Sequence, residues 1–509
     1  MKGVVMRLAH TWSVALLGVD GVPVEIEADI GGGRPNTRIV GLPDASLTEA
    51  KERVRAAIRN SGEKWPSEAV TLALSPAALK KNGSGYDLAL ACAVLAAADA
   101  VPGEALGKTV MIGELSLDGR VREVHGVLPA LLAARRAGLQ RAIVPESTVQ
   151  EAALVHGMEV LGAQTLSHVL QWLRGEPDAL STPGAMQEIP QPEVPDLADV
   201  MGQPEARWAL EVAAAGGHHL LLIGPPGTGK TMLARRLPGL LPALTHDQAL
   251  EVTAIHSIAG MLRPEAPLVS TPPFIAPHHT ASRTALVGGG VGLAKPGVIS
   301  KAHRGVLLLD EACEFGGDRL EALREALEDG EIRLARRDGV VCYPARFQLV
   351  LATNPCPCAP PREADCSCTP HERRRYMARL SGPVLDRVDL RVRMRPMTAM
   401  SIVDSNRPES TATVRKRVDA ARRSARDRWA QQGWVTNADV PGPFLRREFA
   451  LPRKVTMLLD RGLESGAVTA RGADRCLRVA WTLADLAGVD RPDADHVAAA
   501  LEFRDRRAA

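Results

Sequence analysis

The stretch Gly224-Pro-Pro-Gly-Thr-Gly-Lys230-Thr231, which follows the apolar run from His219 to Ile223, decides the fold of this 509-residue chain. An apolar run, a glycine-rich loop and further apolar residues predict a buried strand, a phosphate-binding loop and a helix. The glycines let the backbone turn tightly, so that N–H groups and the positive end of the helix face a polyphosphate. The residues expected to contact ATP are Gly224, Gly227, Thr228, Gly229, Lys230 and Thr231.

Two side chains of the loop have predicted roles. Lys230 is expected to reach the β and γ phosphates, and the Thr231 hydroxyl is expected to ligate Mg²⁺. The alternative, an ordinary glycine-rich turn, is disfavoured because the complete G-x-x-x-x-G-K-T pattern follows a buried strand.

Two later apolar runs also end in polar side chains. The run from Gly305 to Leu309 is followed by Asp310 and Glu311, and the run from Gln348 to Thr353 is followed by Asn354. Such runs suit central parallel strands, whose carboxyl ends form the ligand site of an α/β fold. We expect Asp310 to order Mg²⁺ and Glu311 to deprotonate the attacking water, their side chains pointing to opposite faces of the strand. Asn354 would bond to the γ-phosphate or to that water. The alternative is a surface acidic pair at a strand end.

Length and composition limit the class of protein. A chain of 54.3 kDa is too long for one hydrophobic core and is expected to hold about three domains. The net charge is only +3, so any affinity for nucleic acid must come from a local patch. Aromatic residues make up 3% of the chain, which disfavours a base-stacking platform. We find no convincing secretion signal and no apolar run of about 18 residues, and therefore expect a cytoplasmic protein without membrane contact.

The predicted domain boundaries follow composition. A proline-rich stretch at 181–195 has no apolar periodicity and indicates a stiff linker. It separates an α/β domain at 1–180 from an ATPase core at 196–395, and a helical lid domain at 396–509 follows. The expected lid helices are Leu445 to Leu463, Ala473 to Leu486 and Asp493 to Phe503, after a basic helix from Thr411 whose charges form a solvated face.

The N-terminal segment alternates strand and helix signals. Val22 to Ile30 alternates as a half-buried strand, and Ser46-Leu-Thr-Glu49 is the capping box expected to open a helix. Met111 to Val124 predicts a hairpin with a turn at Asp118-Gly119. The other expected elements are a strand at Ala69 to Leu74, helices at Asp87 to Ala98 and Leu128 to Arg136, and a strand at Ala142 to Pro145.

This order of elements resembles the proteolytic domain of Lon, a ribosomal protein S5-like α+β fold. In Lon the nucleophilic serine lies in a Lys-Asp-Gly-Pro-Ser-Ala-Gly loop, and the matching loop here, Lys81 to Asp87, has Gly85 at the serine position. The position of the catalytic lysine is matched by Leu128-Pro129-Ala130. A one-residue shift would bring Ser84 into place, but a serine without an amine or imidazole base is not a nucleophile. The resemblance therefore implies a degenerate scaffold, with peptidase activity the disfavoured alternative.

Over essentially its whole length the chain resembles the Mg-chelatase-like AAA+ family of bacteria, the ComM (YifB) group. The motifs that carry the resemblance are Ala276-Pro-His278-His279-Thr280, Val287-Gly-Gly-Gly290, Ala302-His303-Arg304-Gly305, Asn354-Pro-Cys356-Pro-Cys358 and Leu380-Ser-Gly-Pro-Val-Leu-Asp-Arg387. The resemblance implies an AAA+ core with a pre-sensor hairpin insert and a helical lid. It also implies a hexameric DNA motor, a helicase or branch-migration translocase, that acts when imported DNA recombines during natural transformation, with a recombinase as partner.

The rival function is a chelatase-type or protein-remodelling motor with the same core and no DNA substrate. A chelatase would need partner subunits, including a metal-binding integrin-like domain, and no such segment occurs in this sequence.

Two arginines have roles implied by ring ATPases. An arginine at the position of Arg387 reaches the γ-phosphate of the neighbouring subunit. From the residues alone, Arg387 could equally pair with Asp386 or Asp389. Arg471, in Thr469-Ala-Arg471-Gly, matches the lid arginine that senses the γ-phosphate.

A predicted hairpin bears on DNA. Glu331 to Tyr343 alternates around an Asp-Gly turn, with Ile332 and Leu334 on one face. In a ring, Arg333, Arg336 and Arg337 would present guanidiniums to DNA phosphates without contacting bases. The alternative is a solvated hairpin whose charges protect an edge from aggregation.

A second insertion, Phe274 to Lys295, is rich in glycine and contains His278 and His279. Paired histidines can bind metal, but no third ligand lies at helical spacing. Pore-loop or interface packing is therefore favoured over zinc.

Four cysteines cluster in the loop 354–371, as Cys356-Pro-Cys358 and Cys366-Ser-Cys368. Four thiolates match a closed tetrahedral Zn²⁺ site, although C-x-C is tighter than the usual C-x-x-C, and His371 is an alternative ligand. The other interpretation is four reduced thiols in a proline-rich loop. A bound zinc ion would stiffen the segment between Asn354 and Arg387.

Overall fold

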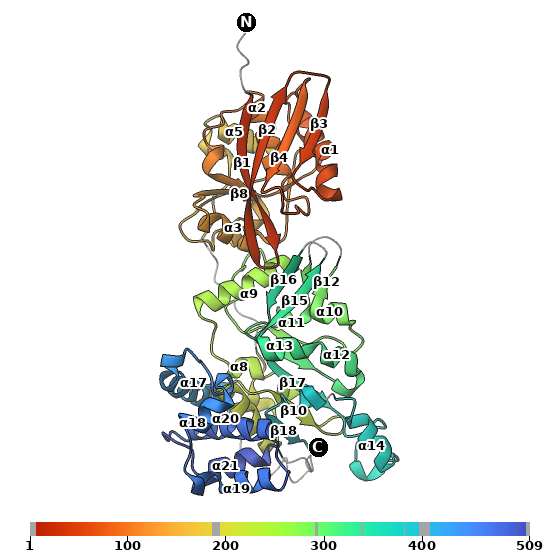
Figure 1. Ribbon diagram of the computed structural model, residues 1–509, viewed down its shortest axis with the longest axis vertical. Coiled ribbons are helices and arrows are strands. Elements are labelled where there is room, and N and C mark those ends of the chain that lie inside the picture. Colours follow the sequence, from red (N-terminus) through yellow and green to blue (C-terminus); the bar gives the residue numbers. More distant parts are fainter. Residues whose placement is uncertain are drawn as a thin grey trace.

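The computed structural model describes residues 7–185, 194–290, 294–336, 339–380, 382–396 and 408–504. They form an elongated molecule with an α/β part at the N-terminal end, a central α/β part and a helical part (Figure 1). Arg337 and most of the proline-rich linker lie outside the described residues, and only the backbone of Arg336 is described.

A seven-stranded sheet forms the N-terminal part, in the order β3-β4-β2-β1-β5-β8-β9. Strand β2 pairs antiparallel with its neighbours β1 and β4, whereas β5, β8 and β9 are parallel to one another. The strands are β1 (Leu8–Leu17), β2 (Asp20–Gly31), β3 (Asn36–Val40), β4 (Ala69–Ser75), β5 (Thr109–Met111), β8 (Arg141–Pro145) and β9 (Glu159–Ala163). The helices are α1 (Ala45–Asn60), α2 (Asp87–Ala97), α3 (Val127–Arg136), α4 (Val149–Ala152) and α5 (Leu166–Leu173).

Helix α2 is the centre of the N-terminal core. Every one of its residues is buried, because its sequence is apolar on all sides and it packs between the sheet and α1. The predicted hairpin is present as β6 (Glu114–Leu115) and β7 (Val121–Arg122), and the other predicted elements of this part lie within one or two residues of their expected bounds.

The start of helix α1 differs from the prediction. Its N-cap is Asp44, whose Oδ1 accepts the N–H of Leu47 at 2.7 Å, and not the predicted capping box at Ser46. The carboxylate of Asp44 also accepts the N–H of Gly83 at 3.0 Å, so it satisfies two backbone donors where a serine hydroxyl would satisfy one. The buried face of α1 is the predicted one: Leu47, Ala50, Val54, Ala57 and Ile58.

The central part contains a five-stranded parallel sheet in the order β11-β14-β17-β10-β18. These strands are β10 (Leu220–Ile223), β11 (Phe274–Ile275), β14 (Val306–Leu309), β17 (Gln348–Thr353) and β18 (Leu390–Arg393). All residues of β10, β14 and β17 are buried, as their continuous apolar runs predict. The parallel register brings the carboxyl ends of these three strands to one edge of the sheet.

Helices and two small hairpins surround this sheet. The hairpins are β12 (Gly288–Gly289) with β13 (Lys295–Pro296), and β15 (Glu331–Arg336) with β16 (Gly339–Pro344). The helices are α6 (Pro204–Gly216), α7 (Lys230–Ala234), α8 (Leu237–Leu240), α9 (His246–Ala259), α10 (Arg283–Val287), α11 (Val298–Lys301), α12 (Gly317–Glu321), α13 (Leu323–Asp329), α14 (Pro370–Met377) and α15 (Gly382–Leu385). In β15, Ile332 is buried and Arg333 is exposed, as predicted.

The helical part packs around a cluster of aromatic rings. Its helices are α17 (Thr411–Arg428), α18 (Gly442–Arg447), α19 (Arg453–Glu464), α20 (Ala470–Leu486) and α21 (Ala494–Glu502). Trp429 is fully buried and contacts the rings of Trp434, Phe444, Phe449 and Trp481. The single helix predicted over 445–463 is wrong: two helices flank Pro452, because proline cannot donate the next helical hydrogen bond.

The arginines of α17 are less solvated than predicted. Arg417 pairs with Glu211 at 2.6 Å, Arg422 donates to the carbonyl of Ala214 at 2.7 Å, and Arg428 pairs with Asp485. Lys416, Arg423 and Arg426 are exposed and form the part of the helix surface that is solvated as predicted. Because α17 packs against α6 and α20, the aliphatic stems of the other arginines are covered while their guanidiniums reach partners.

The N-terminal and central parts contact each other directly. Near the turn between β1 and β2, Leu16 and Val19 pack with Val341 and Tyr343 of β16 (Figure 1). Elsewhere Glu151 accepts the N–H of Leu128 at 2.7 Å and the hydroxyl of Ser257 in α9 at 2.5 Å. The N-terminal sheet is therefore packed against the base of the β15–β16 hairpin.

Within the described parts of the chain, none of the helices has the length and apolar content needed to cross a membrane.

Leu90→Ala tests the N-terminal core. Leu90 of α2 is 0% exposed, so its truncation is expected to lower the free energy of unfolding by about 2–5 kcal/mol. Leu117→Ala, at a side chain that is 59% exposed, is the matched control and should change it by less than about 0.5 kcal/mol. Chemical denaturation followed by circular dichroism measures both, and equal losses would contradict the described core.

Candidate functional site

The phosphate loop follows β10, which lies between β17 and β18 in the parallel sheet. Gly227 and Gly229 have φ of +79° and +90°, a left-handed conformation that side chains rarely adopt. Gly224 approaches the carbonyl of Met394 so closely that a Cβ would lie 2.7 Å from it. Thr228 closes the loop by donating to the carbonyl of Pro225 at 2.9 Å. The loop thus requires the glycines that the sequence places there.

Lys230 is 9% exposed and lies inside the loop. Its Nζ donates to the carbonyls of Gly224 at 2.5 Å and Pro225 at 2.9 Å, and to Asn354 Oδ1 at 3.1 Å. Burial lowers the pKa of Lys230, and the carboxylate of Asp310 opposes that shift. A phosphate group in the loop would offer this ammonium anionic acceptors, which bind it more strongly than carbonyls do.

The oxygens suited to Mg²⁺ lie next to Lys230. The Thr231 hydroxyl donates to Asp310 Oδ2 at 2.5 Å, and Asp310 Oδ1 accepts the N–H of Glu311 at 2.9 Å. Adjacent ligands of an octahedral Mg²⁺ site lie about 3 Å apart, since each Mg–O bond is about 2.1 Å. The hydroxyl and carboxylate are therefore spaced to share one ion.

Glu311 does not continue strand β14, as the sequence analysis assumed. The strand ends at Leu309, and Glu311 has a left-handed φ of +52°, so the turn of the backbone, not strand alternation, separates its carboxylate from that of Asp310. Glu311 Oε2 lies 2.8 Å from Nδ1 of His279. His279 lies in the predicted insertion, but its contact with Glu311 was not predicted, because no spacing rule joins residues 32 positions apart.

His278 and His279 do not form a metal site within the described residues. Nδ1 of His278 lies 2.8 Å from the hydroxyl of Thr280, while His279 contacts Glu311. The two histidines therefore contact different side chains.

A further contact near the loop was missed by sequence reasoning. Gln203 Nε2 donates to the carbonyl of Arg395 at 2.6 Å and lies 3.4 Å from that of Thr228. Gln203 has a left-handed φ of +53° just before α6. The glutamine ties the end of β18 to the phosphate loop.

Arg387 lies at the opposite edge of the sheet from this loop. It precedes β18, whose residue Leu390 pairs with Leu220 at the amino end of β10. Arg387 is 7% exposed, donates to the carbonyl of Pro383 at 2.5 Å and pairs with Glu328 of α13. It therefore pairs with neither Asp386 nor Asp389, the two partners considered from the sequence.

Other arginines lie near Arg387. Burial lowers the pKa of Arg387, as do the positive charges of Arg324, Arg471 and Arg475. Arg475 also binds Asp389 at 2.6 Å. Arg471 is exposed at the start of α20. The two candidate γ-phosphate contacts, Arg387 and Arg471, thus lie close enough in the structure for their charges to interact.

The four cysteines of the 354–371 loop come together. The sulfur of Cys366 lies 3.4 Å from that of Cys356 and 3.5 Å from that of Cys358, and all four sulfurs lie within 4.8 Å of one another, Cys368 included. In a tetrahedral site with Zn–S bonds of about 2.3 Å, sulfurs lie about 3.8 Å apart. The cluster therefore fits a metal ion, and its four thiols complete the set without His371.

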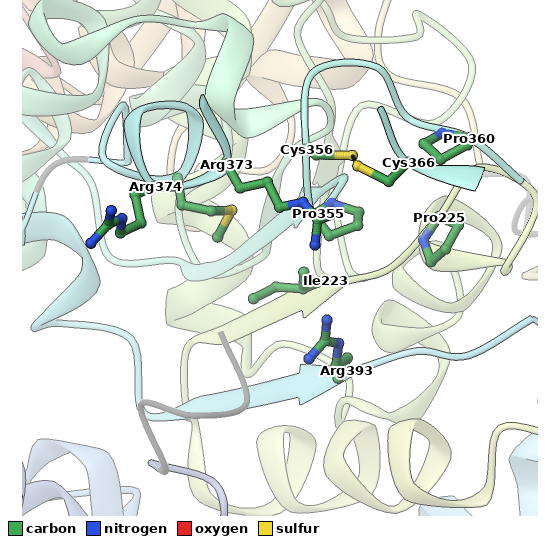
Figure 2. A pocket seen from close by; sticks show the side chains of 10 residues that line it. Ile223, Pro225, Pro355, Cys356, Pro360, Cys366, Arg373, Arg374 and Arg393 are labelled. Atoms are coloured by element: carbon green, nitrogen blue, oxygen red, sulfur yellow. Dashed lines mark hydrogen bonds between the residues drawn. The ribbon is translucent and has the colours of Figure 1, made fainter. Parts of the chain in front are cut away.

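A pocket separates this cluster from the phosphate loop (Figure 2). Pro225 of the loop, Pro355 beside Asn354, and Cys356 line it. The cysteine cluster thus lies next to the residue expected to sense the γ-phosphate.

The hydroxyl of Ser84 and the amine of Lys81 contact different groups. Its hydroxyl donates to Glu114, whereas Nζ of Lys81 donates to the carbonyl of Pro76. Among the described contacts of the N-terminal part, the serine and the amine are therefore engaged with different partners.

Of the predicted DNA contacts, only Arg333 has a described side chain. It is 55% exposed and pairs with Glu331 at 2.6 Å. The carboxylate neutralises part of the charge that a phosphate would meet.

One parallel sheet carries a phosphate loop, a strand followed by two acidic residues and a strand followed by an asparagine. These are the parts of an AAA+ ATPase. A family model described as magnesium chelatase, subunit ChlI, matches residues 196–402. A model described as subunit ChlI of Mg-chelatase matches 26–148, and one for the ChlI C-terminal region matches 408–504.

Three relatives match nearly the full chain. An uncharacterized protein of Mycobacterium tuberculosis is 57% identical over 501 residues, which cover 98% of this chain and 99% of that protein. YifB of Escherichia coli is 40% identical over 98% of this chain and 97% of that protein. Competence protein ComM of Haemophilus influenzae is 39% identical over 98% of both chains. The chain belongs to the Mg-chelatase-like ComM/YifB family, whose AAA+ core implies ATPase activity with ATP and Mg²⁺.

Lys230→Ala is expected to weaken ATP binding by at least about 100-fold, because it removes a buried ammonium that lies within the phosphate loop. Titration with a fluorescent ATP analogue measures the affinity. Lys301→Ala, on α11, is the control and should leave it within about two-fold. Equal affinity of the Lys230 variant and the wild type would remove this loop as the nucleotide site.

Proposed function

We propose that this chain is the subunit of a hexameric, ATP-driven DNA motor of the cytoplasm, a helicase or branch-migration translocase. We further propose that it acts in the recombination of imported DNA during natural transformation, alongside a recombinase. The observation that carries the proposal is the position of Arg387 at the sheet edge opposite the phosphate loop of its own chain.

That position supports a ring. Phosphoryl transfer places negative charge on the γ-phosphate oxygens, and a cation there speeds the reaction. Arg387 precedes the amino end of β18, whereas the phosphate loop follows the carboxyl end of β10, and even a four-residue strand spans about 13 Å. If Arg387 contacts a γ-phosphate, that nucleotide is bound by another subunit. Arg471, whose charge acts on Arg387, would face the same neighbour.

Within one chain the residues have distinct proposed roles. Lys230 binds the β and γ phosphates, and Thr231 and Asp310 hold Mg²⁺, which neutralises phosphate charge when bound. Glu311 deprotonates the attacking water, and Asn354, whose Oδ1 accepts from Lys230, orients the γ-phosphate or that water.

DNA is the proposed substrate because two insertions, residues 274–295 and the hairpin at 331–343, line the same groove. Arg283 and Gly289 of the first insertion line it on one side, and Arg333 of β15 lines it on the other. The buried Ile332 and Tyr343 anchor the β15–β16 hairpin. Arg336 ends β15, and Arg337 is the next residue in the sequence. Guanidiniums in such a place bind DNA phosphates whatever the base sequence. The 39% identical relative is named competence protein ComM.

We propose Zn²⁺ as the metal of the cysteine cluster, with Cys356, Cys358, Cys366 and Cys368 as its four ligands. Sulfur distances of 3.4–3.5 Å support this choice. Since four thiolates leave no open position, the zinc would be structural and would hold the loop beside Asn354.

A chelatase-type or protein-remodelling motor is the second candidate, favoured by family models whose descriptions name magnesium chelatase. It would use the same ATP chemistry without DNA. In either case we propose that residues 1–180 are a degenerate Lon-like scaffold, because the Ser84 hydroxyl donates to Glu114, whereas Nζ of Lys81 donates to the carbonyl of Pro76.

The DNA motor is tested by steady-state ATPase rates without nucleic acid, with single-stranded DNA and with a four-way junction. We expect DNA to raise the rate severalfold. The double variant Arg336→Ala/Arg337→Ala should lose the stimulation and keep the basal rate, because the proposed DNA contacts are removed while the phosphate loop is unchanged. A competent basal rate that no DNA stimulates would favour the protein-remodelling candidate.

The zinc site is tested by metal analysis of protein purified under reducing conditions without chelator. We expect about one zinc ion per chain, absent from the Cys358→Ser/Cys366→Ser variant. Cys342→Ser, outside the cluster, is the control and should retain it. Zinc-free wild-type protein that does not take up zinc would contradict the assignment.

A further inference from the structure

We propose that Asp389 is a positioning residue that fixes Arg387 and Arg471 in the orientation in which they face the neighbouring subunit. This role rests on the proposed ring, in which both arginines act on a nucleotide that another subunit binds. Asp389 precedes β18 and lies at the same sheet edge as Arg387, away from the phosphate loop of its own chain. Its effect on hydrolysis would therefore be exerted through the arginines.

The Asp389 carboxylate is 2% exposed and binds two parts of the chain at once. Oδ1 accepts from Nη1 of Arg475, on α20, at 2.6 Å. Oδ2 accepts the N–H of His219, which directly precedes β10, at 3.0 Å. A buried carboxylate is costly unless donors surround it, so these two partners determine where the group lies. Asp389 thus ties the helical part to the amino edge of the parallel sheet.

Both candidate arginines lie within a few residues of this contact. Arg387 precedes Asp389 by two residues, and Arg471 precedes Arg475 by four, which is about one turn of α20. The positive charges of Arg471 and Arg475 both act on Arg387. Like charges repel one another, and the carboxylate of Asp389 offsets part of this repulsion. The ion pair of Asp389 with Arg475 therefore holds the segment of Arg387 and the start of α20 together.

Other contacts join the same two parts. Nη1 of Arg504 donates to the carbonyl of Val388 at 2.8 Å, and Nε2 of His218 lies 2.8 Å from the hydroxyl of Thr482 in α20. The helical part therefore stays attached to the sheet when the Asp389 contact is lost. Strand β10 is also paired with β17 on one side and β18 on the other, so the phosphate loop that follows it keeps its place.

The position of a cation matters more for the rate than for binding. A displacement of about 1 Å from the reacting group can cost about 100-fold in rate. Because Asp389 contacts the arginine edge and not the loop that binds ATP, its loss is expected to lower kcat and to leave the KM for ATP nearly unchanged.

The test uses full-length protein and steady-state ATPase rates. Asp389→Asn is expected to lower kcat about ten-fold, with the KM for ATP within about two-fold. The amide has the size of the carboxylate but only one accepting oxygen, so Arg475 or the N–H of His219 loses its acceptor. Asp485→Asn is the matched control, because Asp485 is a buried carboxylate of the same helix whose partner, Arg428, lies within the helical part. It should keep kcat within about two-fold.

A second pair of variants tests the contact from the other side. Arg475→Gln should lower kcat as Asp389→Asn does, whereas Arg475→Lys retains the cation and should keep kcat within about three-fold. These variants replace Asp389→Asn in the test if thermal unfolding shows that it does not fold.

Mixed assemblies distinguish an effect on the neighbour from a general loss of structure. Asp389→Asn subunits keep an intact phosphate loop, and Lys230→Ala subunits keep correctly placed arginines. Equal amounts assembled together should hydrolyse ATP faster than the mean of the two separate rates, because a functional pair forms between unlike subunits. The mixture of Arg387→Ala with Lys230→Ala should show the same recovery.

The failures are distinguishable. A wild-type kcat for folded Asp389→Asn would overturn the positioning role, and so would a mixture that stays at the mean while the Arg387→Ala mixture recovers. If the Arg387→Ala mixture also stays at the mean, the proposed contact between subunits fails, and the role of Asp389 falls with it.

Discussion

The nucleotide site depends on the register of one parallel sheet. Ile223 pairs with Thr353, and Leu309 pairs with Leu351, so the carboxyl ends of β10, β17 and β14 meet at one edge. The phosphate loop, Asp310 and Asn354 follow these ends, which is why residues far apart in sequence come within hydrogen-bond distance of one another. A shift of one residue in any of these strands would exchange the side chains that pack on its two faces and would separate these groups.

The same sheet also links the site to the rest of the chain. β14 leads to Glu311, which contacts the insertion at His279, and β17 leads through Asn354 to the cysteine cluster. The β15–β16 hairpin packs against the turn of the long β1–β2 ribbon of the N-terminal part. A short segment of chain therefore connects each element that we propose to contact DNA or metal with a residue of the nucleotide site.

Sequence patterns predicted the parts that local chemistry determines. The G-x-x-x-x-G-K-T loop, the apolar runs of β10, β14 and β17, and the clustered cysteines all occur as expected, because each pattern specifies a backbone conformation or a ligand set by itself. Sequence patterns could not predict contacts between distant segments. The partner of Arg387 is Glu328, and the partner of Glu311 is His279. Helix ends were also missed where a competing residue decided them, as Asp44 and Pro452 did.

The pairing of Arg387 with Glu328 has a consequence for assembly. A subunit alone satisfies this buried charge internally, so in the proposed ring Arg387 would give up a carboxylate to contact a neighbour. In the proposed ring the γ-phosphate would supply the replacement negative charge, and ADP does not carry this group. In a ring built on this contact, subunit association and ATP affinity would share a single coupling free energy, and each would strengthen the other by the same factor. The fraction of subunits in closed rings would then depend on the ratio of ATP to ADP in the surrounding solution.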